Sequence, residues 1–374
     1  MTLTPRRKYT TLQSRARRLV LRFGGESSIS LWGGRGAASE PSVTRIFGLN
    51  IRYTDPNTIQ SFLKSLIGVT ALTVRLGPNH DKLSNTQDET STYLKELLST
   101  WSNIRSVDLD IPPRSIESLQ VISHCQVVEV KLRVRVPLGE EDHEGMRQAQ
   151  VNLARFLNRC CPLLRELSFS SGTDVVDTAL WTHLSPKPNL RTLGTRYYAV
   201  WPETATLPPF LRNHSQSLRA LRFILPIPLP TISPEMYHRL AAIPGLESTE
   251  LPRLKTLTIE VEDEYPASSS NITLPPTLFS FISTHVVSLT CITISNWTLN
   301  VEDFSRLLGV LGNRRKLRKL SIALNGKLIE VMALDSLSMD HRYLTHLTLE
   351  MENATKIDSV SCLNHRCALD RLMI

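Results

Sequence analysis

The chain has 374 residues, of which 41% are hydrophobic and 21% are charged, and its formal net charge is +8 at pH 7. This apolar content excludes a disordered chain, and no uninterrupted apolar run approaches the roughly 20 residues that a transmembrane helix needs. Residues 1–25 contain seven Arg and Lys side chains and no acid, so the basicity belongs to one end of the chain and its body is nearly neutral.

Two short regions precede the regular part of the sequence. We expect residues 1–15 to form a disordered basic tail, because a run of like charges without apolar partners is usually solvated. Residues 16–42 hold an uncertain first repeat and a Gly/Ser-rich linker. The linker is expected because five of the sixteen glycines lie between residues 24 and 41. From residue 43 to residue 374 we predict a single repetitive domain.

A pattern of three apolar positions, apolar-x-x-apolar-x-apolar, recurs along the chain at intervals that average about 29 residues. Its strictest form, Leu-Lys/Arg-x-Leu-x-Phe/Ile, begins at Leu164, Leu218, Leu254 and Leu317. Apolar residues two apart indicate a β-strand with one buried face. The middle positions of the thirteen copies are Leu19, Leu49, Leu72, Val107, Val130, Leu167, Leu193, Leu221, Leu257, Ile292, Leu320, Leu347 and Leu372.

A stretch with helical periodicity precedes most copies, and the clearest places Val151, Ala154 and Leu157 on one stripe. Because a helix stands between successive strands, we expect the strands to pair in parallel through right-handed crossovers. The sequence thus predicts an α/β fold, a leucine-rich-repeat-like solenoid with a parallel concave sheet, helices on the convex side and irregular repeats. The helical stretches are residues 61–67, 92–101, 116–123, 145–158, 234–243, 278–283, 301–309 and 327–336.

These residues resemble the leucine-rich-repeat region of fungal F-box proteins, whose irregular repeats read Leu-Arg/Lys-x-Leu-x-apolar after a helix. The likeness covers roughly residues 43–374. The receptor-type repeat has Asn three positions after the last apolar residue, and here only Asn325 does so, which implies helices on the convex side as in ribonuclease-inhibitor-like proteins. F-box proteins of this kind are substrate receptors of SCF-type ubiquitin ligases, so the resemblance implies protein binding. Since no segment reads as an F-box, which begins near Leu-Pro-x-Glu, an SCF-type adaptor is expected only if an F-box exists outside this chain.

The six cysteines show no Cys-x-x-Cys pair and no regular spacing, which predicts free thiols in a reducing compartment. Cys362, His365 and Cys367 lie close together, but a tetrahedral metal site needs about four ligands. The sequence has no motif for zinc hydrolysis, for a serine nucleophile or for phosphate binding. We therefore expect no enzyme, no cofactor and no metal. The alternative of a divergent hydrolase would require polar side chains gathered in a pocket.

Side chains between the apolar positions of each strand are expected to point into the concave groove. Basic residues occupy these places on the middle strands and acidic residues toward the C-terminus, although Asp108 and Asp110 interrupt the basic part. We predict a groove with a basic middle and an acidic end, suited to a charged polypeptide, with an ordinary polar surface as the alternative. Two tryptophans that follow strands are candidate anchors at the rim. The candidate protein-binding residues are Arg75, Lys131, Arg133, Arg135, Arg222, Glu260, Glu262, Trp201 and Trp297.

These features favour a non-enzymatic, intracellular protein-interaction scaffold in the cytoplasm or the nucleus, similar to the substrate-recognition region of an F-box protein. Its protein partner is expected on the concave face or on the loop rim, and no membrane is expected as a partner. The alternative is a nucleic-acid-associated protein that uses the basic residues 6–22 and whose binding would depend steeply on salt. Because the sequence ends inside a predicted strand, we also expect a fragment, a truncated gene model or a degenerate paralogue.

Overall fold

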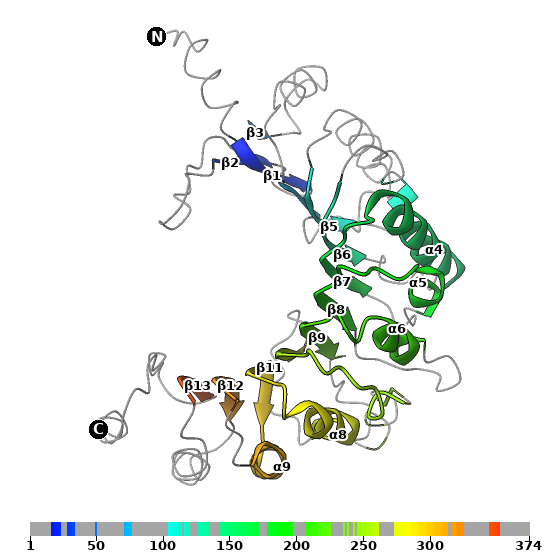
Figure 1. Cartoon of the computed structure of the whole chain (residues 1–374). Helices are drawn as coiled ribbons and strands as arrows, with labels where there is room; N and C mark the ends of the chain where they lie inside the picture. The colour runs from blue at the N-terminus through cyan, green and yellow to red at the C-terminus, as the bar shows by residue number, and fades with distance from the viewer. Residues whose placement is uncertain are drawn as a thin grey trace, which may run out of the picture. The chain divides into compact units, whose positions relative to one another are not determined.

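The chain divides into two compact units, formed by residues 1–189 and 190–374. The computed structural model shows in each of them a β-sheet that carries helices on one side (Figure 1). It describes residues 16–23, 28–33, 49–50, 71–76, 104–111, 113, 116–117, 119, 126–134, 143–171, 178–196, 206–225, 235, 238, 242–243, 245–261, 273–312, 316–324 and 344–351.

The described strands of the first unit form one sheet, in the order β3, β2, β1, β4, β5, β6 and β7. Neighbouring strands from β1 through β4 to β7 are parallel. Helices α4 (His143–Cys160) and α5 (Thr178–His183) lie on one side of β6 and β7 (Figure 1). The strands are β1 (Ala16–Phe23), β2 (Ser28–Gly33), β3 (Leu49–Asn50), β4 (Ala71–Leu76), β5 (Ser106–Ile111), β6 (Glu129–Val134) and β7 (Glu166–Ser171).

The described strands of the second unit follow one another in sequence order, from β8 to β13, and the pairs are all parallel. Helices α6 (Leu207–Asn213), α8 (Pro276–His285) and α9 (Val301–Leu311) lie on one side of this sheet (Figure 1). The strands are β8 (Thr192–Arg196), β9 (Ala220–Leu225), β10 (Thr256–Val261), β11 (Cys291–Leu299), β12 (Lys319–Leu324) and β13 (His346–Met351).

Burial follows the apolar positions of the sequence pattern. Leu167 and Phe169 of β7, and Leu257 and Ile259 of β10, are completely buried. Each such side chain contributes roughly 1.5–3 kcal/mol through the hydrophobic effect. Because the pattern returns on strand after strand, every repeat adds a layer to the core of its unit. The prediction of an α/β leucine-rich-repeat-like solenoid is confirmed.

The helices carry a repeated core position that the sequence analysis missed. Phe156, Phe210 and Phe281 each stand eight residues before the first apolar position of the next strand, as Phe281 does before Leu289. All three rings are at most 4% exposed. The ring of Phe281 packs edge-on against Phe223 of β9, with the ring centroids 5.6 Å apart. In these three repeats a core phenylalanine of the helix precedes the strand pattern, whereas α5 and α9 have Thr182 and Gly309 at the equivalent position.

The middle residues of twelve of the thirteen predicted copies lie in strands, and the copy centred on Leu372 lies outside the described residues. Three predicted helices correspond to α4, α8 and α9. The stretches at 61–67, 92–101 and 327–336 lie outside the described residues, and 116–123 and 234–243 are described only at single positions. Helices α5 and α6 were not predicted, because α5 has six residues and α6 contains Pro208 and Pro209, which read as helix breakers. Proline is compatible with the first turn of a helix, where its missing N–H has no partner to lose.

The expectation that every strand runs in one direction is wrong at the N-terminal edge. There β2 pairs with β1, and β3 with β2, in antiparallel fashion. Strand β2 lies in the stretch interpreted as a linker and follows β1 after only four residues, too few for the crossover that parallel pairing requires. Strand β1 itself is parallel to β4, so the first copy of the pattern belongs to the sheet.

Polar side chains join consecutive repeats of the first unit. Asn158 in α4 donates through Nδ2 to the carbonyl of His183 and accepts through Oδ1 the N–H of Ser185, both at 2.9 Å. The buried Lys187 donates through Nζ to the carbonyl of Leu157 at 2.9 Å, at the C-terminal end of the same helix. A cation at this end is favoured by the helix dipole.

The second unit joins its repeats with different side chains. His285, at the end of α8, accepts the N–H of Leu251 through Nε2 at 3.0 Å. Asp303, in the first turn of α9, accepts the N–H of Leu274 through Oδ2 at 2.9 Å. Each bond spans about one repeat and satisfies a buried backbone N–H that would otherwise cost free energy. The link is thus kept while the residue that makes it changes from repeat to repeat.

Candidate interaction surface

One face of each sheet carries the helices, and we call the other face, formed by the side chains that alternate with the buried ones, the open face. In β10 the three apolar residues are buried, whereas Thr256, Thr258 and Glu260 are half-buried on the open face. Parallel strands in register place equivalent positions side by side, about 4.8 Å apart. The open face is therefore a set of rows that run across the strands.

One row of the second unit consists of hydroxyl groups. Thr258 is in register with Thr293, Thr293 with Ser321, and Ser321 with Thr348. All four side chains are half-buried. Hydroxyl groups both donate and accept hydrogen bonds, so such a row can bond to the backbone of an extended polypeptide. The sequence held the signal, since each residue stands between the second and third apolar positions of its copy.

Two of the predicted site residues of the second unit meet on the open face. Arg222 of β9 and Glu260 of β10 form an ion pair, with Nη2 and Oε1 2.5 Å apart. The Arg222 side chain is 45% exposed and that of Glu260 is 17% exposed. The sequence pattern placed Arg222 in the basic middle and Glu260 at the acidic end of the groove, but they are neighbours that partly neutralise each other.

Opposite charges also alternate on the open face of the first unit. Lys131 of β6 forms an ion pair with Glu166 of β7, with Nζ and Oε1 2.8 Å apart. The register places Asp108 of β5 on the other side of Lys131, and Asp110, which is 2% exposed, beside Arg133. Lys131 therefore stands between two carboxylates, and Arg133 stands beside one, rather than in a basic field.

The order of charge along the chain differs from the predicted one within the described side chains. In β5–β7 carboxylates outnumber cations on the open face, whereas in β8–β12 cations outnumber carboxylates. The prediction rested on the basic residues of each strand. The net charge of the open face also depends on the acids at equivalent positions of neighbouring strands. The residues concerned are Asp108, Asp110, Glu129, Lys131, Arg133 and Glu166, and then Arg196, Arg222, Glu260 and Lys319.

Trp297 does not offer an exposed anchor, because it is buried with 3% of its surface exposed. Ile292 and Ile294 are the buried residues in the first part of β11, and Trp297 and Leu299 in the second. The pairing with β12 shifts between these parts, where Asn296 has a φ of 57°. Between the pairs Thr293–Ser321 and Thr298–Ala323, β11 has four residues and β12 has one, and this odd excess changes which side chains face the core. Asparagine tolerates this backbone region better than most residues.

The other predicted site residues have no described side chain. Arg75 belongs to β4, whose backbone at this position is described while the side chain is not. Arg135, Glu262 and Trp201 lie outside the described residues. Their part in an interaction surface stays a prediction.

Three ionisable groups of the described core have shifted pKa values. Burial raises the pKa of Asp303 from 3.8 to about 6, against the opposing effects of the Leu274 N–H and of Arg306. Burial also lowers the pKa of His285, although its bond to the Phe281 carbonyl favours the charged ring. Lys187 likewise has a lowered pKa through burial, which the nearby Cys161 partly offsets. All three groups bond to backbone of another repeat or of their own helix, so their role is to join elements of the core.

In the part of the chain that the structure describes, no three His, Cys, Asp or Glu side chains gather as a metal site requires. Cys160 and Cys161 are buried free thiols and Cys291 is a half-buried one, while the cluster of Cys362, His365 and Cys367 is not among the described residues. Within the same described segments, no helix has the length and apolar character to cross a membrane.

Comparisons with known proteins assign the chain to no family. No family model matches the chain, and no curated protein matches it. Among solved structures, the chain is similar to one in the crystal structure of the Rad7 and Elc1 complex in yeast, with 12% sequence identity and a TM-score of 0.36. The match covers 84% of this chain and 88% of that chain. A likeness at this level does not bear on function.

Proposed function

We propose that this chain is a non-enzymatic protein-interaction scaffold that binds a polypeptide on the open face of its sheets. The observation that supports this proposal best is the row of hydroxyl groups at Thr258, Thr293, Ser321 and Thr348, flanked by Arg222 and Glu260. A polar surface that repeats at strand spacing suits an extended partner, whose own groups also repeat at regular intervals.

The described charges of the open face fit a binding role better than a catalytic one. The ion pairs Lys131–Glu166 and Arg222–Glu260 run along the sheet between neighbouring strands. Catalysis instead needs a base, a nucleophile and a stabilising group that converge on one point. Repeated polar rows give complementarity over a wide area, which determines partner choice and association rate.

The finer part of the proposal follows from the resemblance to F-box proteins. We propose that the bound polypeptide is a substrate for ubiquitin ligation, in the cytoplasm or the nucleus, and that an SCF-type adaptor joins through an F-box that these residues do not supply. Fusing an F-box segment to the chain should then lead to ubiquitination of the captured partner in a reconstituted ligase. If the partner is captured but never ubiquitinated, the proposed scaffold function stands and the proposed role in ubiquitin ligation is refuted.

The binding surface is tested by adding bulk to the open face. Thr258→Arg combined with Ser321→Arg places two long side chains on the row, one strand apart on either side of Thr293. We expect affinity capture with the full chain to lose its partner, and the purified pair to bind about tenfold more weakly, because the partner can no longer approach the sheet.

A matched variant controls for the added charge. Ser280 and Ser305 are exposed on α8 and α9, so Ser280→Arg combined with Ser305→Arg changes the net charge equally on the helix side. This variant should retain the partner, while circular dichroism should show both variants folded. Equal retention by the two variants would mean that the partner does not use the open face.

A further inference from the structure

The turns that lead into the strands of the second unit repeat one backbone arrangement. The carbonyl of Arg191 accepts the N–H groups of Arg219 and Ala220 at 2.8 and 2.9 Å, and the carbonyl of Arg219 accepts those of Lys255 and Thr256 at 2.8 and 3.0 Å. The same pair of bonds continues to the strands that follow. The residue just before each strand is therefore stacked on its neighbours at the strand spacing of about 4.8 Å.

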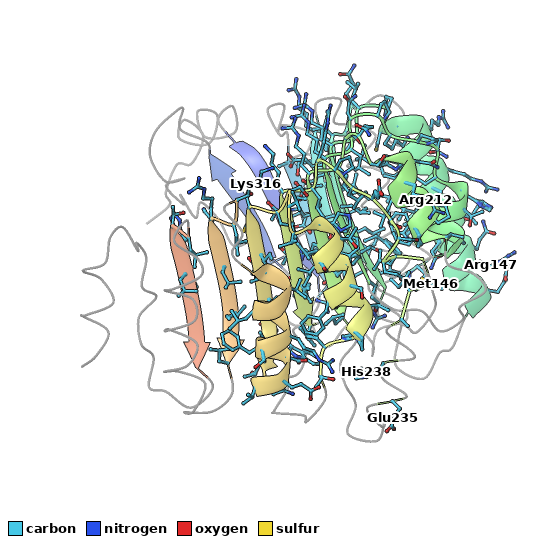
Figure 2. The ribbon with its side chains drawn as sticks, turned by 60° about the horizontal axis from the view of Figure 1, so that its bottom comes forward. Met146, Arg147, Arg212, Glu235, His238 and Lys316 are labelled. Atoms are coloured by element: carbon cyan, nitrogen blue, oxygen red, sulfur yellow. The ribbon has the colours of Figure 1, made fainter. Side chains whose placement is uncertain are left out.

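Most of these stacked positions are cationic. Arg191, Arg219, Lys255 and Arg318 occupy four of them, and all four are exposed. Lys316, beside Arg318, lies at the end of the sheet where the strands begin (Figure 2). We call the following six exposed residues the basic edge: Arg191, Arg219, Arg253, Lys255, Lys316 and Arg318.

The fold itself does not require cations at these positions. Thr290 and Thr345 stand at the equivalent places before β11 and β13 and take part in the same backbone bonds. Their hydroxyl groups also bond back to the previous carbonyl, Thr290 to Lys255 at 3.1 Å and Thr345 to Arg318 at 3.0 Å. The backbone arrangement therefore does not depend on a cation at this position.

The basic edge keeps an excess of positive charge. Among the described residues of these turns, the acids are Glu247 and Glu250, both before β10. A row of cations without an equal number of acids attracts a polyanion and holds it along the row, which runs from one strand to the next.

The neighbouring apolar surface distinguishes between polyanions. Val287 is 59% exposed on the turn before β11, where the cationic row is interrupted by Thr290. The large hydrophobic residues exposed in the described part of the chain are aliphatic, so the nucleobases of a single strand would find no aromatic ring to stack on. A peptide can place an aliphatic side chain against Val287 while its carboxylates meet the cations on both sides.

We propose that the basic edge binds an acidic polypeptide segment that carries an apolar side chain among its Asp and Glu residues. This site lies at the beginning of the strands rather than on the open face. It therefore adds a second contact to the proposed scaffold and can fail without affecting the first.

The test uses the full chain and a fluorescein-labelled peptide of Asp and Glu residues around a central Leu, with binding followed by fluorescence anisotropy. We expect saturable binding that weakens as salt is raised, because exposed charges are screened. Replacing Arg219, Lys255 and Arg318 with Glu should weaken binding by about tenfold or more, since attraction becomes repulsion at three contacts. The neutral triple variant Arg219→Gln, Lys255→Gln and Arg318→Gln should lose less affinity for the peptide. It keeps the test valid if the Glu variant does not fold.

A charge-matched control lies on the helix side. Arg147 lies on α4 of the first unit and Arg212 on α6 of the second, so neither belongs to a strand or to the basic edge (Figure 2). Replacing Arg147, Arg155 and Arg212 with Glu makes the same change in net charge, and this variant should keep the affinity of the wild type. If both Glu variants bound the peptide equally weakly, the loss of affinity would come from net charge alone, and the proposal would be wrong.

Two further probes complete the experiment. A peptide in which Asn and Gln replace the acids should not bind, and binding at equal affinity would contradict an electrostatic site. A DNA duplex that bound the same three residues more tightly than the acidic peptide would assign the basic edge to nucleic acid and overturn the proposed occupant.

Discussion

Asp303 holds its carboxylate in the interior of the second unit, where none of its surface is exposed. Its backbone N–H donates to the Oδ1 atom of Asn300, the residue that caps α9, and its Oδ2 atom accepts the N–H of Leu274. One side chain thus links the start of α9 to the segment that leads into α8. The link has a cost at neutral pH, because burial raises the pKa of Asp303 to about 6 and so disfavours the ionised form.

The pH dependence of stability should show this cost. The folded chain binds the proton of Asp303 more tightly than the unfolded chain, so this residue lowers the free energy of unfolding as pH rises from about 4 to about 6. Asp303→Asn keeps an acceptor for the Leu274 N–H and removes the charge. We expect it to equal the wild type near pH 4 and to exceed it at pH 7 by on the order of 2 kcal/mol, measured by urea unfolding.

Glu302 provides the control for this prediction. It is an exposed carboxylate in the same turn of α9, paired with Arg306. Glu302 also contributes to the raised pKa of Asp303, but less than burial does, so Glu302→Gln should narrow the difference between the two pH values only slightly. The same pH profile for Asp303→Asn and the wild type would show that Asp303 does not titrate as the burial implies.

Helix α8 ends in an arrangement that α6 repeats. His285 and His214 each place Nδ1 near the carbonyl four residues earlier, at 2.8 and 2.7 Å, and each ring packs on a phenylalanine with ring centroids 4.2 Å apart. In His285 the N–H of Leu251 points to Nε2, which must then be the acceptor, so Nδ1 carries the proton. The neutral ring thus satisfies one carbonyl of its own helix and one N–H of the preceding turn.

Protonation of His285 should break this cap. Because burial lowers its pKa below the ordinary 6.5, the unfolded chain takes up the proton first, and the stabilisation from this residue is present above pH 6.5 and lost as pH falls. His285→Leu should lower the free energy of unfolding by about 1–2 kcal/mol at pH 7.5 through the unsatisfied Leu251 N–H. The difference from the wild type should shrink on acidification, as followed by denaturant unfolding at a series of pH values.

The exposed His183 offers the matched comparison. His183→Leu removes an imidazole from the end of α5 without removing a buried partner of a backbone N–H, so it should change stability little at either pH. A constant difference between His285→Leu and the wild type at every pH would contradict the role of the neutral ring.

Each unit, taken as a whole, is a row of repeats that contact mainly their neighbours. In such an array stability is approximately a sum of repeat and nearest-neighbour contributions. Leu221 of β9 and Leu320 of β12 are both core residues, and β10 and β11 separate their strands, a distance of about 14 Å at the usual strand spacing. Leu257 of β10 and Ile292 of β11, by contrast, are in register on adjacent strands.

Double substitutions should separate these two cases. Leu221→Ala and Leu320→Ala should each cost about 3 kcal/mol, and their combination should equal the sum to within about 0.5 kcal/mol. Leu257→Ala with Ile292→Ala should depart from the sum by more than that, because both side chains line one cavity. Denaturant unfolding gives all these values, and strict additivity of the adjacent pair would contradict the nearest-neighbour description.

The alternative function, nucleic-acid association through residues 6–22, also depends on the whole molecule. The structure places residues 16–23 in β1, which pairs with β4, so removing residues 1–25 would remove a strand as well as seven cations. Neutralising Arg6, Arg7 and Lys8 is the sharper test of that alternative. Steeply salt-dependent retention of DNA that disappears with these three charges would favour it over the scaffold.

How much of this protein could be predicted from its sequence differs with the kind of feature. Strand positions, parallel pairing and the solenoid class follow from local pattern, because each copy brings its own apolar face, and one helix per repeat leaves only parallel pairing. The short helix α6 and the hairpin of β1 and β2 were missed, since their prolines and glycines suit both loops and helix or strand ends. Trp297 was misplaced because one bulge at Asn296 exchanges the two faces of its strand.

The sequence by itself determined which residues form the core, since burial there depends on apolar spacing that every copy carries within a few positions. Only the tertiary structure decided the charge of the surface. Lys131 meets Glu166, and Arg222 meets Glu260, across residues that are 35 and 38 positions apart in the chain. An electrostatic interaction depends on distance in space, and that distance is fixed when strands come into register.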